Sequence, residues 1–187
     1  MRYLKDEEFI RGNCPMTKQD IRILTMARLQ LQENSRFLDV GTGTGTVAIE
    51  GSRIAAKGQV ISIEKDEEAY KTAVINKEKF QCSNLDLIKG DALEVLKNMQ
   101  ESFDGIFIGG SGGDLKEIII ECCRLLNKGG RLVLNFVTIE NLYRAIEVIR
   151  NLGMDFNCTQ VAITNTRGKS LMLSSNNPIF IIDTEKK

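Results

Sequence analysis

The sequence predicts an α/β domain built on a mostly parallel β-sheet with helices on both faces. Short apolar runs rich in β-branched residues alternate with longer amphipathic runs over most of the chain. The length of 187 residues fits one domain, and no linker, repeat or low-complexity tract divides it. Alternation of strands and helices implies right-handed crossovers, which place helices on both faces of a parallel sheet.

The expected elements follow one another in a regular order. A helix is expected over 17–31, because Leu24 and Leu31 lie on one face of it, and Thr17 with Asp20 resembles a capping box at its start. Strands and helices then alternate. The strands are expected over 37–40, 60–63, 85–88, 105–108 and 131–137, and the helices over 47–56, 67–80, 93–99, 115–126 and 139–152.

The last third of the chain changes character. Strands are expected over 156–164 and 178–183 without a long helix between them, which predicts an antiparallel addition at one edge of the sheet. Residues 165–176 are expected to form a loop or a short extra hairpin. One domain over 1–187, with antiparallel C-terminal strands within 154–183, is therefore the expected organisation.

The composition excludes several kinds of function. Lys and Arg number 25, as do Asp and Glu, so the net charge of zero argues against a nucleic-acid partner. The absence of histidine removes Ser-His-Asp and Cys-His triads and every His-ligated metal site, and no metal is expected. Five cysteines without a C-x-x-C pair indicate reduced thiols in the cytoplasm. No signal peptide and no apolar run of eighteen residues is present, so no membrane partner is expected.

The motif that carries most chemistry is D-V-G-T-G-T-G, from Asp39 to Gly45, between an expected strand and an expected helix. Glycines at such a turn let the backbone approach a ligand, and the helix N-terminus offers free N–H groups. The spacing does not fit the dinucleotide fingerprint G-x-G-x-x-G, because Thr46 stands at the third position and Gly45 comes one residue early. No lysine follows the glycines, so the loop is not a P-loop. Asp39 is placed to meet the ammonium or sulfonium of a cationic ligand.

The order acid-x-Gly-x-Gly-x-Gly resembles the class I S-adenosylmethionine-dependent methyltransferases. Glu64 ends the second expected strand, where that family holds the ribose hydroxyls, and Asp91-Ala92 follows the third, where it contacts the adenine. Alternatively, Glu64 is a solvated acid at a strand end and Asp91 a helix N-cap. The resemblance implies S-adenosylmethionine as cofactor, with an N-terminal helical segment over 1–34 covering its site. The cofactor-binding residues that it implies are Thr17, Asp39, Gly41, Thr42, Gly43, Thr44, Gly45, Glu64, Asp91 and Ala92.

The loop after the fourth strand, F-I-G-G-S-G-G, narrows the resemblance. The chain lacks the N/D-P-P-Y/F motif of amino methyltransferases and the Pro-Cys nucleophile of cytosine-carbon methyltransferases. Together with C-P-M-T-K, G-G-R-L-V-L-N-F-V-T-I-E and the late N-P-I-F, this loop resembles the precorrin carbon-15 methyltransferases (decarboxylating) of cobalamin biosynthesis. The resemblance runs from about Met16 to Ile182. Phe136 and Thr42 depart from it, where a small residue and an alanine are more usual.

This resemblance implies a fold, a reaction and an assembly. The fold is the three-layer α/β/α Rossmann-like sheet of class I methyltransferases, seven-stranded with an antiparallel C-terminal strand. The reaction is methylation of carbon 15 of (cobalt-)precorrin-6B, with loss of the ring C acetate carboxyl as carbon dioxide, giving (cobalt-)precorrin-7. The partner is thus a tetrapyrrole, and a homo-oligomer, most often a tetramer, is implied.

The substrate of such an enzyme carries many carboxylates, so cations and backbone donors are expected around it. The candidates are Lys18, Arg22 and the loop residues Gly109, Gly110, Ser111, Gly112 and Gly113, with Arg167 and Lys169 as further cations. Asp114 and Glu140 lie near strand ends and could handle a proton. An electron-rich carbon and an activated methyl donor need no protein base, so no catalytic side chain of large effect is expected.

Three other functions stay open from the sequence. A transfer-RNA methyltransferase would share the glycine loop, although the zero net charge counts against it. A non-enzymatic nucleotide-binding domain is disfavoured by the displaced glycine, and an O-methyltransferase by the I-G-G-S-G-G loop. The apolar run of Leu171, Met172 and Leu173 in a polar stretch suggests a subunit contact, a lid over a flat macrocycle, or plain packing of an edge strand.

Overall fold

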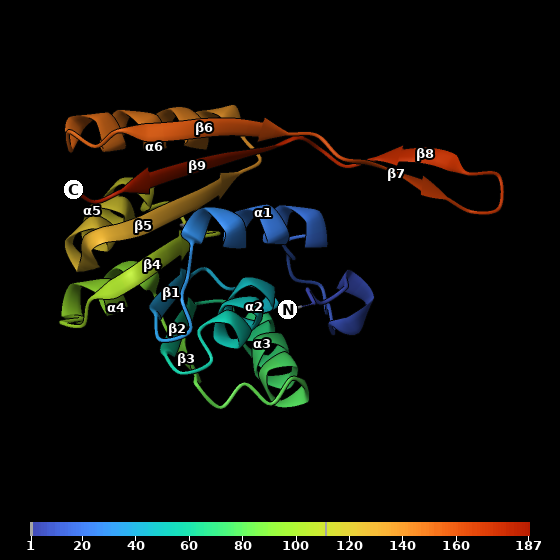
Figure 1. Ribbon diagram of the computed structural model, residues 1–187, viewed down its shortest axis with the longest axis horizontal. Coiled ribbons are helices and arrows are strands. Elements are labelled where there is room, and N and C mark those ends of the chain that lie inside the picture. Colours follow the sequence, from blue (N-terminus) through green and yellow to red (C-terminus); the bar gives the residue numbers. More distant parts are fainter. Residues whose placement is uncertain (1, 111) are drawn as a thin grey trace.

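A computed structural model describes residues 2–110 and 112–187. Seven strands form one sheet in the order β3-β2-β1-β4-β5-β9-β6, and two more form a separate hairpin (Figure 1). The sheet strands are β1 Arg36–Val40, β2 Gln59–Glu64, β3 Leu85–Lys89, β4 Phe103–Ile108, β5 Leu126–Phe136, β6 Phe156–Val161 and β9 Ile179–Glu185. The helices are η1 Asp6–Glu8, α1 Gln19–Leu29, α2 Thr46–Ile54, α3 Glu67–Lys79, α4 Ala92–Asn98, α5 Leu115–Leu125 and α6 Ile139–Asn151.

The sheet topology confirms the predicted fold class. Strands β1 to β5 pair in parallel, and β9 pairs antiparallel with both β5 and β6. Because the chain order reverses between β1 and β4, the carboxyl ends of these two strands open a crevice, the usual ligand position in an open α/β sheet.

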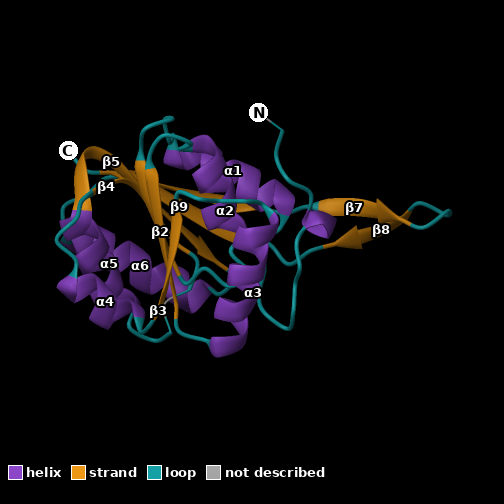
Figure 2. Ribbon diagram, turned by 90° about the horizontal axis from the view of Figure 1, so that it is seen from below, coloured by secondary structure: helices purple, strands orange, loops and turns teal. Residues whose placement is uncertain are grey.

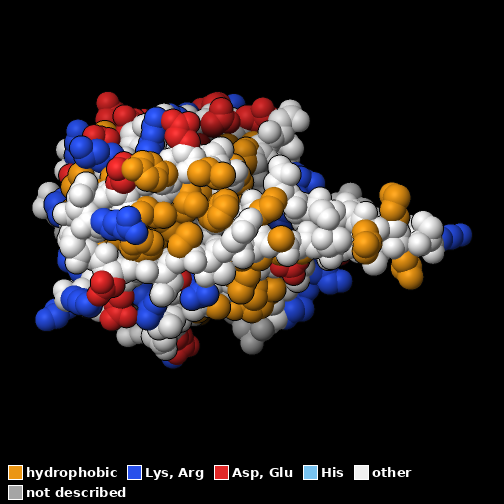
Figure 3. Space-filling view, turned by 90° about the horizontal axis from the view of Figure 1, so that it is seen from above, with side chains coloured by type: hydrophobic (Ala, Val, Ile, Leu, Met, Phe, Trp, Pro, Cys, Tyr) orange, Lys and Arg blue, Asp and Glu red, His pale blue; other side chains and the backbone are white. Residues whose placement is uncertain are grey.

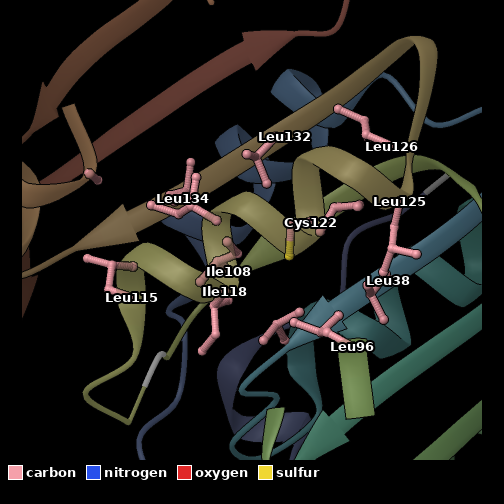
Figure 4. Close-up of a cluster of buried hydrophobic side chains, with 14 of the residues drawn as sticks. Leu38, Leu96, Ile108, Leu115, Ile118, Cys122, Leu125, Leu126, Leu132 and Leu134 are labelled. Atoms are coloured by element: carbon pink, nitrogen blue, oxygen red, sulfur yellow. The ribbon is translucent and has the colours of Figure 1, made fainter. Parts of the chain in front are cut away.

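The helices cover both faces of the sheet. Helices α1, α2 and α3 lie on one face and α4, α5 and α6 on the other (Figure 2). The core between α5, α6 and the sheet is built from buried leucine and isoleucine side chains, among them Leu38, Ile108, Ile118, Leu132 and Leu134 (Figure 4). Burial on both sides explains why the central strands are continuous apolar runs.

Two predictions for the first helix were wrong. The helix begins two residues later than predicted, and a different residue caps it. Helix α1 begins at Gln19, whose backbone N–H donates to Oδ1 of Asp6 at 2.8 Å. A carboxylate thirteen residues upstream thus caps the helix, instead of the Thr17–Asp20 pair. Strand β5 also begins five residues before the expected position, because Leu126 pairs with Phe103 ahead of the turn at Gly129 and Gly130.

The segment between β6 and β9 forms a hairpin of β7 Thr164–Arg167 and β8 Met172–Ser175. Of the loop and the short hairpin that were expected here, the hairpin is confirmed. The hairpin projects away from the body of the molecule (Figure 1). Among the residues that the structure describes, no helix combines the length and the hydropathy needed to cross a membrane.

Candidate active site

A cavity of about 820 Å³ opens at the carboxyl ends of the strands. One wall is the end of an N-terminal strap, which we define as residues 4–18. The other walls come from the glycine loop, from the ends of β2, β3, β4 and β5, and from the segments that flank the hairpin. The polypeptide contributes residues 13–18, 41–43, 63–66 and 90–92, together with single positions between and after these ranges, among them the acid Glu68.

The glycine loop is shaped by close approach of three backbone segments. Gly41 has φ +75°, and a Cβ built there would lie 2.6 Å from the carbonyl oxygen of Gly110. A Cβ at Gly43, where φ is +57°, would lie 2.7 Å from the carbonyl oxygen of Pro15. Only glycine fits these two positions, because L side chains disfavour positive φ and backbone cannot yield. The loop is therefore held between the strap and the loop after β4.

Glu64, at the end of β2, faces this loop. One carboxylate oxygen accepts the backbone N–H of Gly43 at 2.8 Å, and the other accepts that of Asp66 at 2.9 Å. Both oxygens are thus fixed in orientation on the cavity wall, which Glu64 lines. A carboxylate with further acceptor capacity at this point suits a ligand that carries hydroxyl groups.

Asp91 serves as the N-cap of α4, as the alternative interpretation expected. Its side chain accepts the backbone N–H of Leu93 at 3.0 Å and that of Glu94 at 3.3 Å. Asp91 and Ala92 also line the cavity, so the capping role and a place beside a ligand are compatible.

Asp39 lies beneath the glycine loop and does not line the cavity. The residue is 1% exposed, and its Oδ2 accepts the hydroxyl of Thr42 at 2.6 Å and that of Ser62 at 3.4 Å. Burial, with a smaller contribution from the nearby negative charge of Glu64, raises the pKa of Asp39 to about 7. The expectation that Asp39 meets a cationic ligand does not fit this placement; the residue instead holds Thr42 and the loop from below.

This raised pKa predicts a stability that depends on pH. Between about pH 4 and pH 7 the folded protein keeps a proton on Asp39 that the unfolded chain releases, so the free energy of unfolding falls as pH rises through that window. Asp39→Asn is expected to flatten that part of the curve. Urea unfolding of both proteins at several pH values measures it, and parallel curves for the two proteins would contradict the assignment.

The loop after β4 brings glycine backbone to the cavity. Gly109, Gly110 and Gly112 line it, and the carbonyl of Gly112 accepts a hydrogen bond from the Lys65 ammonium at 3.4 Å. Gly113 does not line the cavity, which differs from expectation. Ser111, another predicted substrate contact, lies outside the described residues.

Of four other predicted residues, two line the cavity and two do not. Thr17 and Lys18 line the cavity. Thr44 is fully buried, and Gly45 stands at the start of α2 and packs against Ala73 of α3. Neither residue lines the cavity.

Arg22 needs the clearest correction. It is fully buried and does not line the cavity. Its guanidinium binds the carbonyls of Leu4 and Thr17 and forms ion pairs with Asp6 at 3.2 Å and Glu50 at 3.7 Å. These protein partners occupy the cation, so Arg22 does not fit the role of a substrate contact.

A second set of residues that line the cavity was not predicted from the sequence. Four asparagine residues line the cavity, namely Asn13, Asn135, Asn176 and Asn177. An apolar surface is formed by Phe107, Val137, Val161, Ile163 and Ile179. The rule that ligands bind at strand ends could have indicated Asn135, because it lies near the end of β5, whereas the amides beside the hairpin depend on how the chain returns to the sheet.

The side chains that were expected to handle a proton do not line the cavity. Glu140 pairs with Arg144 at 2.6 Å on the exposed face of α6, and Asp114 stands at the start of α5. Within 2–110 and 112–187, no group of three metal-binding side chains is close enough to hold an ion. The arrangement offers backbone donors, amides and an apolar face, which suits binding and orientation of a large ligand.

Comparison with known proteins agrees with this geometry. The family described as the precorrin methyltransferase domain matches residues 8–186. A probable cobalt-precorrin-6B C(15)-methyltransferase (decarboxylating) of Sulfurisphaera tokodaii is 37% identical, and the match covers 98% of this chain and 97% of the relative. The cobalt-precorrin-6B C(15)-methyltransferase (decarboxylating) of Salmonella typhimurium is 36% identical, with 98% and 96% covered.

A solved structure shows the same fold. The crystal structure of precorrin-6y C5,15-methyltransferase from Geobacter metallireducens superposes with a TM-score of 0.93 at 34% identity, covering 99% of this chain and 97% of that one. Family match, full-length relatives and superposition cover the whole sheet and the cavity at its edge. The chain therefore belongs to the precorrin methyltransferase family.

Proposed function

We propose that the protein methylates carbon 15 of (cobalt-)precorrin-6B from S-adenosylmethionine and removes the ring C acetate carboxyl, giving (cobalt-)precorrin-7. The observation that carries the proposal is the cavity of about 820 Å³ that joins a close-packed glycine loop to a broad apolar surface. The relatives named for this reaction match over nearly their full length, which supports the same substrate class here.

The residues on one side of the cavity fit S-adenosylmethionine. Gly41 and Gly43 line the cavity and carry no side chain, so a ligand can lie directly on their backbone. Glu64 offers fixed carboxylate oxygens for ribose hydroxyls, and Thr17 lies on the strap across from the loop. When bound, this cofactor supplies an electrophilic methyl group on a sulfonium.

The other side of the cavity fits a flat macrocycle with carboxylate side chains. Val137, Val161, Ile163 and Ile179 provide an apolar surface for the ring system. Lys18, Lys65 and the amides of Asn176 and Asn177 provide donors for carboxylates at its rim. The protein thus aligns donor and acceptor and excludes water, while the conjugated ring accepts the electrons released on decarboxylation.

The choice of substrate class is tested by following the methyl group. Purified protein is incubated with methyl-labelled S-adenosylmethionine and either cobalt-precorrin-6B or unmodified transfer RNA. Label is expected in the tetrapyrrole and not in the RNA. Label in the RNA alone would favour the rival methyltransferase, and tight binding of NAD without S-adenosylmethionine, measured by calorimetry, would favour a nucleotide-binding domain.

We also propose that the β7-β8 hairpin joins subunits of a homo-oligomer, with a tetramer favoured. Leu171, Met172 and Leu173 are 68%, 67% and 72% exposed. They belong to the hairpin segment, which projects away from the body of the molecule and carries apolar side chains (Figure 3). A lid over the macrocycle would have to point the other way. Apolar side chains at such a position are stabilised by contact with another copy.

A cytoplasmic location is in keeping with the five unpaired cysteines.

Removal of these three side chains tests the assembly. Changing Leu171, Met172 and Leu173 to serine is expected to convert the oligomer to smaller species in sedimentation velocity, without lowering the melting temperature of the body. Ile75→Ser removes an apolar side chain of 46% exposure from α3 and serves as the control. A monomeric wild type, or an unchanged mass in the triple variant, would refute the role of the hairpin.

A further inference from the structure

The strap and the glycine loop touch each other at the cavity. The carbonyl oxygen of Pro15 lies 2.7 Å from the position that a Cβ on Gly43 would occupy. The strap residues 13–18 continue from this contact along the cavity wall. A ligand held by the glycine loop therefore lies beside the strap as well.

Asn76 connects these two segments from behind. It is a fully buried residue of α3, and its Oδ1 accepts the backbone N–H of Ile10 at 2.8 Å. Its Nδ2 donates to the carbonyl of Ile10 at 2.8 Å and to the carbonyl of Thr44 at 2.9 Å. Two carbonyls require the two donors of the amide and one N–H requires its acceptor, so the side chain fits in one orientation only.

Arg22 fixes the two ends of the strap. Its guanidinium binds the carbonyl of Leu4 near one end and that of Thr17, at 2.8 Å, near the other. Glu50, which is also fully buried, accepts the backbone N–H of Leu4 at 2.6 Å. The strap is therefore a closed loop of chain that is held at both ends by Arg22 and in its middle by Asn76.

We propose that Asn76 is a positioning residue that couples the strap to the glycine loop, so that the two walls of the cofactor site are ordered as one unit. Asn76 does not line the cavity and acts through Ile10 and Thr44. Without this link, the strap is not ordered against the loop before the cofactor binds. Cofactor binding must then order it, and the conformational entropy lost in that step weakens binding. The inference rests on the proposed function, because the ligand in question is S-adenosylmethionine.

A pair of asparagine variants tests the coupling. Asn76→Ala is expected to raise the Kd for S-adenosylmethionine in calorimetry about tenfold, equivalent to about 1.4 kcal/mol. In turnover assays the KM for the cofactor rises in the same way, while kcat changes less than about twofold. Asn84→Ala is the control, since the amide of Asn84 also binds backbone carbonyls, those of Ser52 at 3.1 Å and Ala55 at 2.8 Å, but away from the cavity.

The control separates coupling from general loss of stability. Both variants are expected to melt at lower temperature than the wild type, and only Asn76→Ala is expected to bind the cofactor less tightly. Equal affinities in the two variants would overturn the proposal. No binding of S-adenosylmethionine by the wild type would reject the proposed function itself, and this inference with it.

Hydrogen exchange on the wild-type protein gives a test that needs no variant. The backbone N–H groups of Ile10, Asn13, Cys14 and residues 16–18 are expected to exchange about tenfold more slowly when S-adenosylmethionine is bound, together with those of 41–45. Protection confined to 41–45 would show that the strap responds independently of the loop, and would overturn the proposal even if Asn76→Ala did not fold.

Discussion

Gly41→Ala is expected to lower the affinity for S-adenosylmethionine at least about a hundredfold, which corresponds to about 2.7 kcal/mol. The added Cβ would lie 2.6 Å from the carbonyl oxygen of Gly110, and neither backbone segment can move without reshaping the cavity. The left-handed backbone at φ +75° adds a cost of about 1–2 kcal/mol for any L side chain. Titration calorimetry with the cofactor measures the loss directly.

Gly153→Ala is the matched control for this variant. Gly153 has a similar φ of +68°, but a Cβ there would meet no atom within 4 Å. It carries the backbone strain without the clash, so cofactor affinity is expected to stay unchanged. Comparable affinity in the two variants would show that the close approach of Gly41 and Gly110 does not shape the site. Glu68 is an acid that lines the cavity, and Glu68→Gln is expected to slow turnover less than Gly41→Ala. A Glu68→Gln variant that binds the cofactor without turnover would contradict this.

Arg22→Met is expected to lower the free energy of unfolding by about 3–5 kcal/mol, the usual result of removing one partner from a buried ion pair. The variant leaves the fully buried carboxylate of Glu50 without its Arg22 partner, although Arg53 still lies 2.9 Å away. It also leaves the carbonyls of Leu4 and Thr17 without a donor. Urea unfolding followed by circular dichroism measures the change.

Arg144→Met provides the comparison for a surface pair. Arg144 and Glu140 form an exposed i,i+4 pair on α6, and such a pair contributes about 0.5 kcal/mol or less. A loss below about 1 kcal/mol for Arg22→Met would mean that the buried network does not hold the strap.

The sequence was sufficient to predict the sheet and the strand ends that meet at the cavity. Strand and helix periods place Gly41, Glu64 and Asp91 at successive strand ends, and those ends meet at one edge in a parallel sheet. The hairpin was one of two expectations for its segment. These predictions succeed because they depend on local period and on general topology.

The errors concern side chains whose surroundings come from distant segments. Asp39 stands at the predicted strand end, but Thr42 and Ser62 hold its carboxylate under the loop and not above it. Arg22 was expected to reach a substrate, whereas Glu50 and the carbonyl of Leu4 bury it. Helical periodicity assigns a residue to a face and does not identify what covers that face.

Mass spectrometry of the tetrapyrrole product tests whether the protein both methylates and decarboxylates cobalt-precorrin-6B. Cobalt-precorrin-6B is incubated with S-adenosylmethionine and either the wild-type protein or Gly41→Ala. The product of the wild-type protein is expected to have gained one methyl group and lost one carbon dioxide, and the variant is expected to form much less of it. An unchanged tetrapyrrole in the presence of wild-type protein that binds S-adenosylmethionine would contradict the proposed reaction.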